Sequence, residues 1–197
     1  MSEPAGRAAT PAAELARTVV FAAFIAVLGI FPGLYWAAVP LVLQNAGPML
    51  AGSVLGARRG GAAVLLFLAL VALGLPLLSG GRGGIAPFAG ASGGFMIGWL
   101  AAAVVTGLVV AAFRRPTVPV LLLANVAGVL ADYLVGIPYW GIMTGDLPSA
   151  AAQSLLFLPG DAVKLVLVSV VAAAVHRAVP SLTGSRAGSR AGSRAGS

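Results

Sequence analysis

The sequence contains no cysteine and a single histidine, His176. The absence of cysteine excludes disulfide bonds, thiolate metal sites and cysteine nucleophiles together. Aspartate and glutamate number only five, so few side chains are left that could ligate a metal ion. We therefore expect a protein that holds no cofactor of its own.

Charge is also scarce in this chain. Charged residues make up 9% of the 197 residues, whereas a soluble domain carries about 25%. Hydrophobic residues make up 59%, and a soluble fold of that composition would have too few polar groups to cover its surface. The sequence therefore predicts an integral membrane protein. Soluble enzymes and nucleic-acid-binding proteins are excluded despite the net charge of +7, because the basic residues stand isolated between long apolar runs.

Long apolar runs predict an all-α membrane protein with six transmembrane helices. A spanning helix needs about 20 apolar residues, and the forty uncharged residues of 18–57 suffice for two crossings. A short segment, 1–13, precedes the membrane domain, 14–178. The tail, 179–197, ends in three GSRA repeats and GS, and it is predicted to be disordered. The six predicted helices lie at 14–31, 41–57, 61–78, 93–113, 118–138 and 155–177.

The distribution of arginine predicts the orientation of these helices. If both termini lie on one side, ten arginines fall on that side and only Arg82 on the other. The remaining base, Lys164, lies within the last predicted helix. Cytoplasmic loops carry an excess of Lys and Arg. We therefore expect both termini in the cytoplasm and Arg82 outside, in a bacterial cytoplasmic membrane.

Three ionisable residues fall inside the predicted spans: Asp132, Asp161 and Lys164. Each costs about 2.5–3.5 kcal/mol on insertion scales, so each is by default a functional hypothesis. Asp161 and Lys164 are three residues apart on one helix face, just after the helix-interrupting pair Pro159 and Gly160. The alternative is an internal salt bridge that only neutralises itself.

Other polar groups fall toward the predicted outer ends of the helices. Arg82 is either a receptor for a carboxylate or a solvated charge, and an interfacial aromatic belt accounts for Tyr139 better than a binding role does. Together with the ionisable residues, these groups predict a compact pocket that opens outward. A suitable ligand is small and partly apolar, with both hydrogen-bond donors and acceptors. The further candidates are Gln44, Asn45, Arg82, Ser92 and Tyr139.

Three stretches resemble the BioY family, the biotin-binding S components of energy-coupling-factor (ECF) transporters. They are VPLVLQNAGPMLAGSVLGARRGGAAVLLFLALVALGLPLLSGG at 39–81, GASGGFMIGWLAA at 90–102 and FLPGDAVK at 157–164. The family usually has Gln-Thr where this chain has Gln44-Asn45, and Gly-Pro-Thr-Gly-Gly at 90–94. The resemblance implies a high-affinity biotin receptor with six helices and an outward pocket.

The resemblance also implies roles for particular residues. Asp161 would accept from the ureido N–H groups of biotin, and Lys164 would donate to its ureido carbonyl or its carboxylate. Asp132 is less clearly matched and would support the pocket. Ala22 and Ala26 match the small-residue motif by which S components meet the T component. Read from the residues alone, this alanine pair equally fits packing inside the bundle.

Energy coupling is expected from other chains. Members of this family pair with a transmembrane T component and two cytoplasmic ATPases. The sequence around Lys164, the only lysine, lacks the Gly-x-x-x-x-Gly-Lys-Ser/Thr pattern that cradles nucleotide phosphates. The chain itself is therefore expected to bind no nucleotide.

Two alternatives remain at this point. One is an S component for another vitamin, such as thiamine or riboflavin, which composition cannot distinguish. The other is a rhomboid-type intramembrane serine protease, since 90–93 reads Gly-Ala-Ser-Gly, with Ser92 as nucleophile and His176 as base. The predicted layout separates these two residues by about 30 Å of hydrocarbon, whereas a nucleophile needs its base within hydrogen-bond reach. We therefore do not expect an enzyme.

Overall fold

The computed structural model describes residues 10–31, 34–36 and 39–179, and the predicted tail from 180 onward lies outside this range. The described chain is helical apart from one short antiparallel hairpin, which pairs β1 with β2. In order, the elements are α1 (Pro11–Ile30), β1 (Leu34–Trp36), β2 (Val39–Leu41), the 3-10 turn η1 (Leu43–Asn45), α2 (Ala46–Ala72), α3 (Ala86–Ala89), α4 (Gly93–Ala112), α5 (Val118–Thr144), α6 (Leu147–Ser154), the 3-10 turn η2 (Leu155–Phe157) and α7 (Leu158–Ala178).

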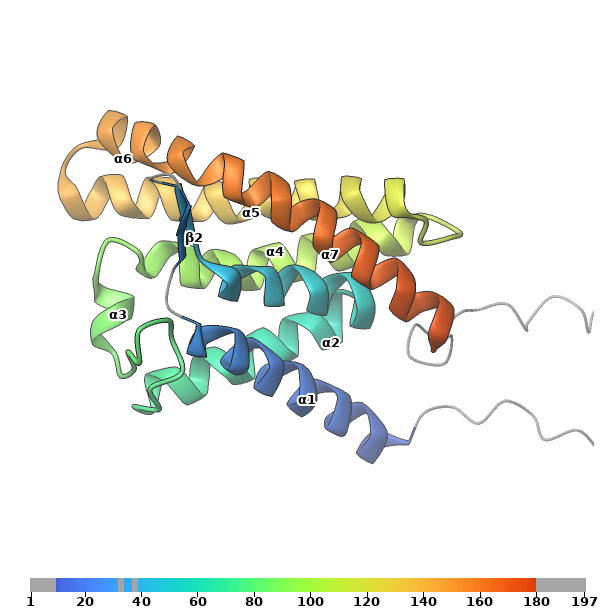
Figure 1. The fold of residues 1–197 in the computed structure, drawn as a ribbon. Helices are drawn as coiled ribbons and strands as arrows, with labels where there is room; N and C mark the ends of the chain where they lie inside the picture. The colour runs from blue at the N-terminus through green and yellow to red at the C-terminus, as the bar shows by residue number, and fades with distance from the viewer. Residues whose placement is uncertain (1–9, 32–33, 37–38, 180–197) are drawn as a thin grey trace, which may run out of the picture.

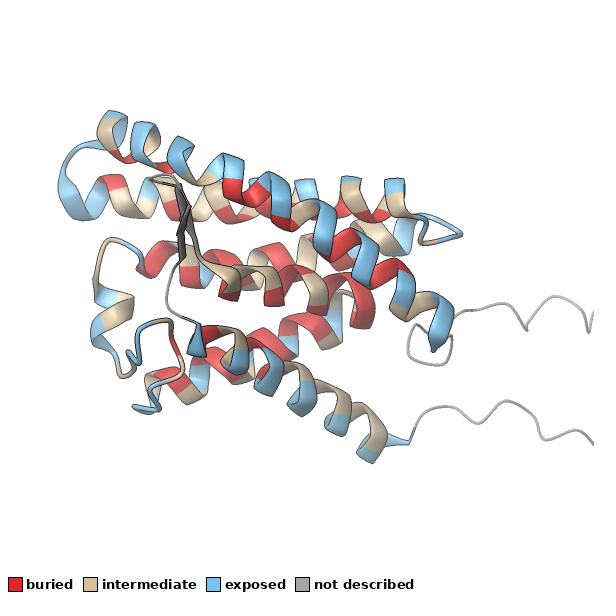
Figure 2. Ribbon diagram, viewed as in Figure 1, coloured by how far each residue is buried: buried red, intermediate tan, exposed pale blue. Residues whose placement is uncertain are grey.

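Five helical stretches are long and apolar enough to cross a membrane, which confirms the predicted all-helical membrane class. In Figure 1, α1 begins and α7 ends at the same end of the bundle, here called the termini end. The large hydrophobic residues that remain exposed line the outer surface of these helices (Figure 2), as a surface in contact with lipid requires. The five stretches are Pro11–Ile30, Leu43–Ala72, Gly93–Ala112, Val118–Thr144 and Leu147–Ala178.

Helix α2 contains a sharp break at Gly56, whose φ is 80° and ψ is 176°. The chain turns back there, because Gly60 in the second arm lies directly against the backbone of Ala51 and Gly52 in the first (Figure 1). The two arms correspond to the predicted helices 41–57 and 61–78, and the reversal falls at Gly56, two residues before the predicted loop that carries Arg58 and Arg59. The reversal takes a single residue, since glycine alone reaches this backbone conformation without strain.

Helix boundaries elsewhere follow local sequence signals. Helix α1 begins at Pro11, three residues before its predicted start, and Thr10 caps it by accepting from the Ala13 amide. The second arm of α2 ends at Ala72, six residues before its predicted end, because the following 73–85 is rich in Gly and Pro. The loop that follows carries α3 and lies beside the start of α4.

Helix α4 occupies the middle of the bundle and packs against α2 on one side and α5 on the other. One core cluster joins α1, the second arm of α2 and α4 around Ile25, Phe67 and Trp99. A second cluster joins the first arm of α2, α5 and α7 around Val54 and Leu121. The red, buried residues of Figure 2 accordingly face the interior of the bundle.

Contact between α4 and α5 depends on glycine. A Cβ at Gly98 would collide with the backbone and carboxylate of Asp132, and one at Gly94 would collide with Tyr139. Gly136 on α5 lies in the same way against the ring of Phe95. Such close approach supplies the packing that drives helices together where lipid provides no hydrophobic force. It also brings Asp132 to the inner surface of the bundle.

The alanine pair of α1 packs inward. Ala22 is 3% exposed and belongs to the core cluster around Phe67, and Ala26 is partly buried against the same cluster. Ala22 is therefore not available for contact with another protein, and the internal-packing alternative holds for it. At the termini end, α1 is fastened by an ion pair between Glu14 and Arg59 of α2.

A row of buried polar side chains links three helices midway along the bundle. Ser53 of α2 donates to Asn125 of α5 at 3.0 Å, and Asn125 donates to Ser169 of α7 at 3.1 Å. Each of the three is buried. Because a polar group deep in an apolar core needs a partner, these bonds favour one register among the three helices.

The break at Gly56 gives a stability prediction. Gly56→Ala is expected to lower the free energy of unfolding by about 1–3 kcal/mol, because alanine is strained at this positive φ. A Cβ there would meet no atom within 4 Å, so the backbone alone would be responsible. Thermal unfolding in detergent measures the change. Gly90→Ala is the matched control, because Gly90 has φ −88° and room for a methyl group, and an equal loss in both variants would contradict the prediction.

Candidate functional site

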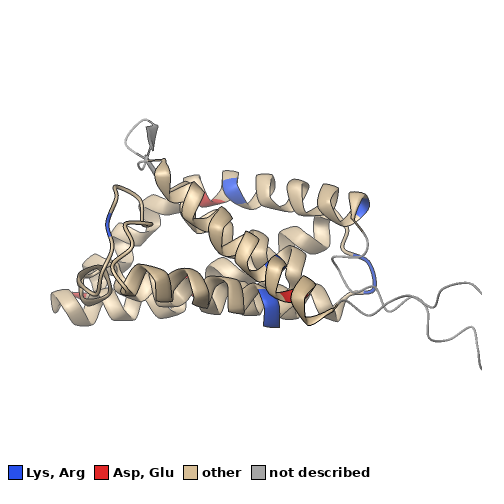
Figure 3. Cartoon of the chain, turned by 90° about the horizontal axis from the view of Figure 1, so that it is seen from below, with Lys and Arg blue, Asp and Glu red and all other residues tan. Residues whose placement is uncertain are grey.

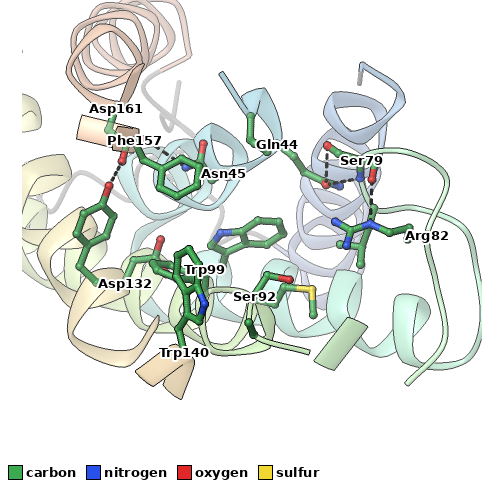
Figure 4. A pocket seen from close by; sticks show the side chains of 16 residues that line it. Gln44, Asn45, Ser79, Arg82, Ser92, Trp99, Asp132, Trp140, Phe157 and Asp161 are labelled. Atoms are coloured by element: carbon green, nitrogen blue, oxygen red, sulfur yellow. Dashed lines mark hydrogen bonds between the residues drawn. The ribbon is translucent and has the colours of Figure 1, made fainter. Parts of the chain in front are cut away.

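A cavity of about 390 Å³ lies at the end of the bundle opposite the termini end. Its walls come from η1, the loop at 78–82, the start of α4, the later part of α5, and the junction of η2 with α7. Figure 4 shows side chains from these elements pointing toward a common space. Its volume falls within the range of about 300–1,000 Å³ that is usual for small-molecule sites.

Asp161 anchors one end of this cavity. It lies in the first turn of α7, where Pro159 starts the helix. One carboxylate oxygen, Oδ1, accepts from Lys164 Nζ at 2.6 Å and from Asn45 Nδ2 at 3.3 Å. The other, Oδ2, accepts from the Tyr133 hydroxyl at 2.6 Å. Asp161 thus joins α7 to η1 and α5, and it retains acceptor capacity on Oδ2 at the cavity wall.

Lys164 lies behind Asp161 and does not line the cavity. Its side chain is 3% exposed. The ammonium group donates to Asp161 Oδ1, to Asn45 Oδ1 at 2.8 Å and to the Val42 carbonyl at 3.2 Å. These three acceptors use all three donors of a lysine. In this structure Lys164 therefore holds Asp161 and Asn45 in place, while Asp161 reaches the ligand space.

Asp132 contributes a second carboxylate to the cavity wall. It is 6% exposed, and its Oδ1 is buried against Gly98. Within the part of the chain that the structure describes, this carboxylate makes no hydrogen bond or ion pair, and its Oδ1 is buried without a partner. A buried acceptor left unpaired costs about 1–3 kcal/mol. Asp132 is therefore a strong acceptor for any donor that a ligand brings.

Gln44 is also at the cavity wall, but the backbone uses its polar atoms. Its Nε2 donates to the carbonyls of Leu77 at 2.7 Å and Ile25 at 3.2 Å, and its Oε1 accepts from the Ser79 amide at 3.0 Å. Gln44 therefore ties α1 and the loop at 78–82 to η1. The partner that a buried glutamine requires is main chain in each case.

The remaining predicted residues divide between the wall and its support. Arg82 and Ser92 are exposed and line the cavity, with Arg82 at the end away from Asp161 (Figure 4). Tyr139 does not line it: its hydroxyl donates to the Phe88 carbonyl at 2.6 Å and holds α3 against α5. The six predicted residues that reach the cavity are Asp161, Asp132, Gln44, Asn45, Arg82 and Ser92.

Aromatic side chains form much of the wall, and the sequence analysis did not name Phe95, Trp99, Tyr133 or Phe157 as site residues. Phe95 meets Tyr133 edge-on at 5.9 Å between ring centroids and Trp140 at 6.1 Å. Trp99 and Phe157 complete this group. The sequence held one signal for Tyr133, which directly follows Asp132 in a predicted span. A buried Asp161 needs a hydrogen-bond donor, and a tyrosine hydroxyl in a neighbouring span can supply it. The others resemble ordinary apolar residues of a membrane helix.

The serine protease arrangement is absent from the described residues. His176 lies near the end of α7 at the termini end, with Nε2 2.9 Å from the Ser53 carbonyl. Ser92 precedes α4 at the cavity end of the bundle (Figure 1). The two side chains are therefore at opposite ends, and Ser92 has no base within reach of its hydroxyl.

Charged side chains are few along the bundle, as Figure 3 shows. A buried acid–base pair, a second buried carboxylate and aromatic walls enclose one cavity in a helical membrane protein. Fold and site together define a membrane protein that holds a small ligand. The chain belongs to the BioY family, which matches residues 3–181.

Similar proteins carry consistent names. A protein of Rhodobacter capsulatus named Biotin transporter BioY is 46% identical over 177 residues, which cover 82% of this chain and 92% of that protein. One of the same name from Rhizobium etli is 43% identical over 176 residues, covering 84% and 92%. The crystal structure of the S-component for biotin from an ECF-type ABC transporter is similar in fold, with a TM-score of 0.78 and 33% identity, covering 86% of this chain and 95% of that one.

The buried pair gives a second stability prediction. Lys164→Met leaves the Asp161 carboxylate without its cation and is expected to cost about 3–5 kcal/mol. Asp161→Asn combined with Lys164→Met removes both charges, so the double variant is expected to be more stable than Lys164→Met alone. Thermal unfolding of the ligand-free protein in detergent compares them. If the double variant is the less stable of the two, the unpaired charge is not the cause.

Proposed function

We propose that this protein binds biotin with high affinity and takes it up as the S component of an ECF transporter. One observation carries the proposal: acceptors and donors lie at opposite ends of one aromatic cavity. Asp132 and Asp161 form the acceptor end, and the Arg82 guanidinium lies at the other. Biotin has the matching polarity, with a ureido ring at one end and a carboxylate at the other. The names of the relatives support the same ligand.

The acceptor end suits a ureido ring. This ring offers two N–H donors, and the cavity offers Oδ2 of Asp161 and the unpaired Asp132 carboxylate. A donor that reaches the cavity side of the Asp132 carboxylate gives this acid a hydrogen-bond partner, which it lacks among the described residues, and so contributes to affinity for the ligand. Asn45 and Lys164 act from behind by orienting Asp161. Trp99 and Trp140 supply apolar surface for the bicyclic ring.

The other end suits the carboxylate. Arg82 lies on an exposed glycine-rich loop, and the one hydrogen bond of its side chain within the described residues runs from Nε to the Ser79 carbonyl at 3.3 Å. Its terminal nitrogens thus remain available, and a guanidinium matches a carboxylate through two parallel hydrogen bonds. Ser92 and Gln44 also line the cavity, and the Gln44 amide lies beside Ser79 at the Arg82 end (Figure 4).

The membrane arrangement forms part of the proposal. We propose six crossings of the bacterial cytoplasmic membrane by residues 14–178, with both termini in the cytoplasm and the cavity opening outward. The two arms of α2 then count as separate crossings, although the ten residues of 46–55 extend only about 15 Å and need η1 and the hairpin to complete the path. The arginine excess at the termini end supports this orientation. The tail, 179–197, would lie in the cytoplasm.

Energy coupling then comes from partners. We propose that a transmembrane T component and two ATPase subunits power uptake, since the sequence around Lys164 offers no phosphate-binding loop. Docking through Ala22 is not part of this proposal, because that residue is buried within the chain. The protein is thus proposed as a substrate-binding subunit, and not as an enzyme.

Binding of tritiated biotin to the purified full-length chain tests the ligand. Excess unlabelled biotin should displace the label, and excess thiamine or riboflavin should not. Asp161→Asn is expected to weaken binding by more than about tenfold, or about 1.4 kcal/mol, because it removes the charged acceptor. Asp146→Asn is the matched control, since Asp146 is exposed, caps α6 and does not line the cavity. Displacement by thiamine or riboflavin, or an unchanged affinity in Asp161→Asn, would contradict the assignment.

The role of Arg82 has a separate test. Arg82→Gln is expected to weaken biotin binding by about tenfold, because the carboxylate loses its cation. The same variant should bind biotinamide, which has no negative charge, about as well as the natural protein does. Displacement curves for the two ligands on both proteins measure the difference. If Arg82→Gln weakens both ligands equally, Arg82 shapes the loop and does not read the carboxylate.

A further inference from the structure

The acceptor end of the cavity holds more acidic groups than basic ones. Two carboxylates, Asp132 and Asp161, lie there with one ammonium, Lys164. That ammonium is committed to Asp161 at 2.6 Å and is turned away from the ligand space. Among the described residues no cation is paired with Asp132, and Arg82 is at the far end of the cavity (Figure 4). One buried carboxylate is therefore left without a counter-charge.

The surrounding rings add to this preference. Tyr133, Phe95 and Trp140 form a connected aromatic group around the same end, with centroid separations of 5.9 and 6.1 Å. The faces of aromatic rings attract cations, by about 0.5–1 kcal/mol when exposed and about 2 kcal/mol or more when desolvated. An unpaired carboxylate and aromatic faces together are the features of a site for an organic cation.

A neutral ureido ring supplies hydrogen-bond donors to this site but no charge. Replacing the ureido oxygen by an imino nitrogen gives a cyclic guanidine, which is protonated at neutral pH. Both ring N–H groups remain, the planar shape is kept, and a positive charge now faces Asp132. Because a guanidinium attracts a carboxylate as an opposite charge in addition to donating hydrogen bonds to it, the exchange favours binding at this wall.

We propose that the cavity also accepts a guanidinium cation in place of the ureido ring, and that Asp132 is the residue that selects for it. The inference rests on the proposed function, which orients the ring of biotin toward Asp132 and Asp161. It extends the ligand class to cationic cyclic guanidines that carry a carboxylate tail. Asp161 and Lys164 neutralise each other, so the charge preference comes from Asp132 alone.

The probe is 2-iminobiotin, tested by displacement of tritiated biotin from the purified full-length chain at neutral pH. Half-displacement is expected within about tenfold of the concentration needed with unlabelled biotin. A biotin analogue with a thiocarbonyl in place of the ureido carbonyl is the neutral control, because it also loses the oxygen but gains no charge. The cation should displace the label at a lower concentration than this neutral analogue. If the neutral analogue instead displaces the label at the lower concentration, this measurement on the natural protein overturns the inference.

Asp132→Asn assigns the effect to one residue, since it removes the charge and keeps the size and one acceptor oxygen. This variant should weaken 2-iminobiotin at least about tenfold more than it weakens biotin, with Asp146→Asn as the control. Equal weakening of both ligands would overturn the inference. The inference would also be overturned if 2-iminobiotin, at about a thousandfold excess, failed to displace tritiated biotin from protein that binds biotin. Absence of biotin binding would instead overturn the proposed function itself.

Discussion

The structure depends on keeping one acid and one base buried next to each other in an apolar bundle. Asp161 and Lys164 are almost without exposure, and removing two charges from water costs more than their attraction returns unless other polar groups complete the site. Here Tyr133, Asn45 and the Val42 carbonyl complete it. Satisfying this pair therefore brings η1, α5 and α7 together at one end, and that end is where the cavity forms.

The two ends of the bundle solve different problems. Toward the termini end, apolar clusters pack as a solid core and the Ser53, Asn125 and Ser169 row pairs its polar groups internally, and among the described residues only Nδ1 of His176 is buried there without a hydrogen-bond partner. Toward the other end, Asp132 is left with an unpaired oxygen and aromatic rings face an open space. A buried acid without a hydrogen-bond partner beside a cavity is what a ligand can complete, and the closely packed opposite end holds the helices in register for it.

Particular residues show how far sequence reasoning extended. The apolar runs, the charged pair in α7 and the group Gln44, Asn45 and Arg82 were all recognisable, because burying polar groups is costly wherever the helices pack. A reversal between 41–57 and 61–78 was predicted as well, but its position at the single residue Gly56 was not, since a glycine in a small-residue stretch looks like ordinary helix packing. Lys164 was expected to touch the ligand, yet its three donors are used by neighbours that are far away in the sequence.

By itself, the sequence determined that this chain belongs in a membrane and which polar residues must be explained there, because composition and hydropathy depend only on the residues present. The tertiary structure alone decided what each polar group does. Asp161 and Asp132 face the cavity, while Lys164 and Tyr139 support it, although all four looked alike as polar residues in apolar helices. The reason is that a hydrogen-bond partner from another helix cannot be identified until the helices are placed side by side.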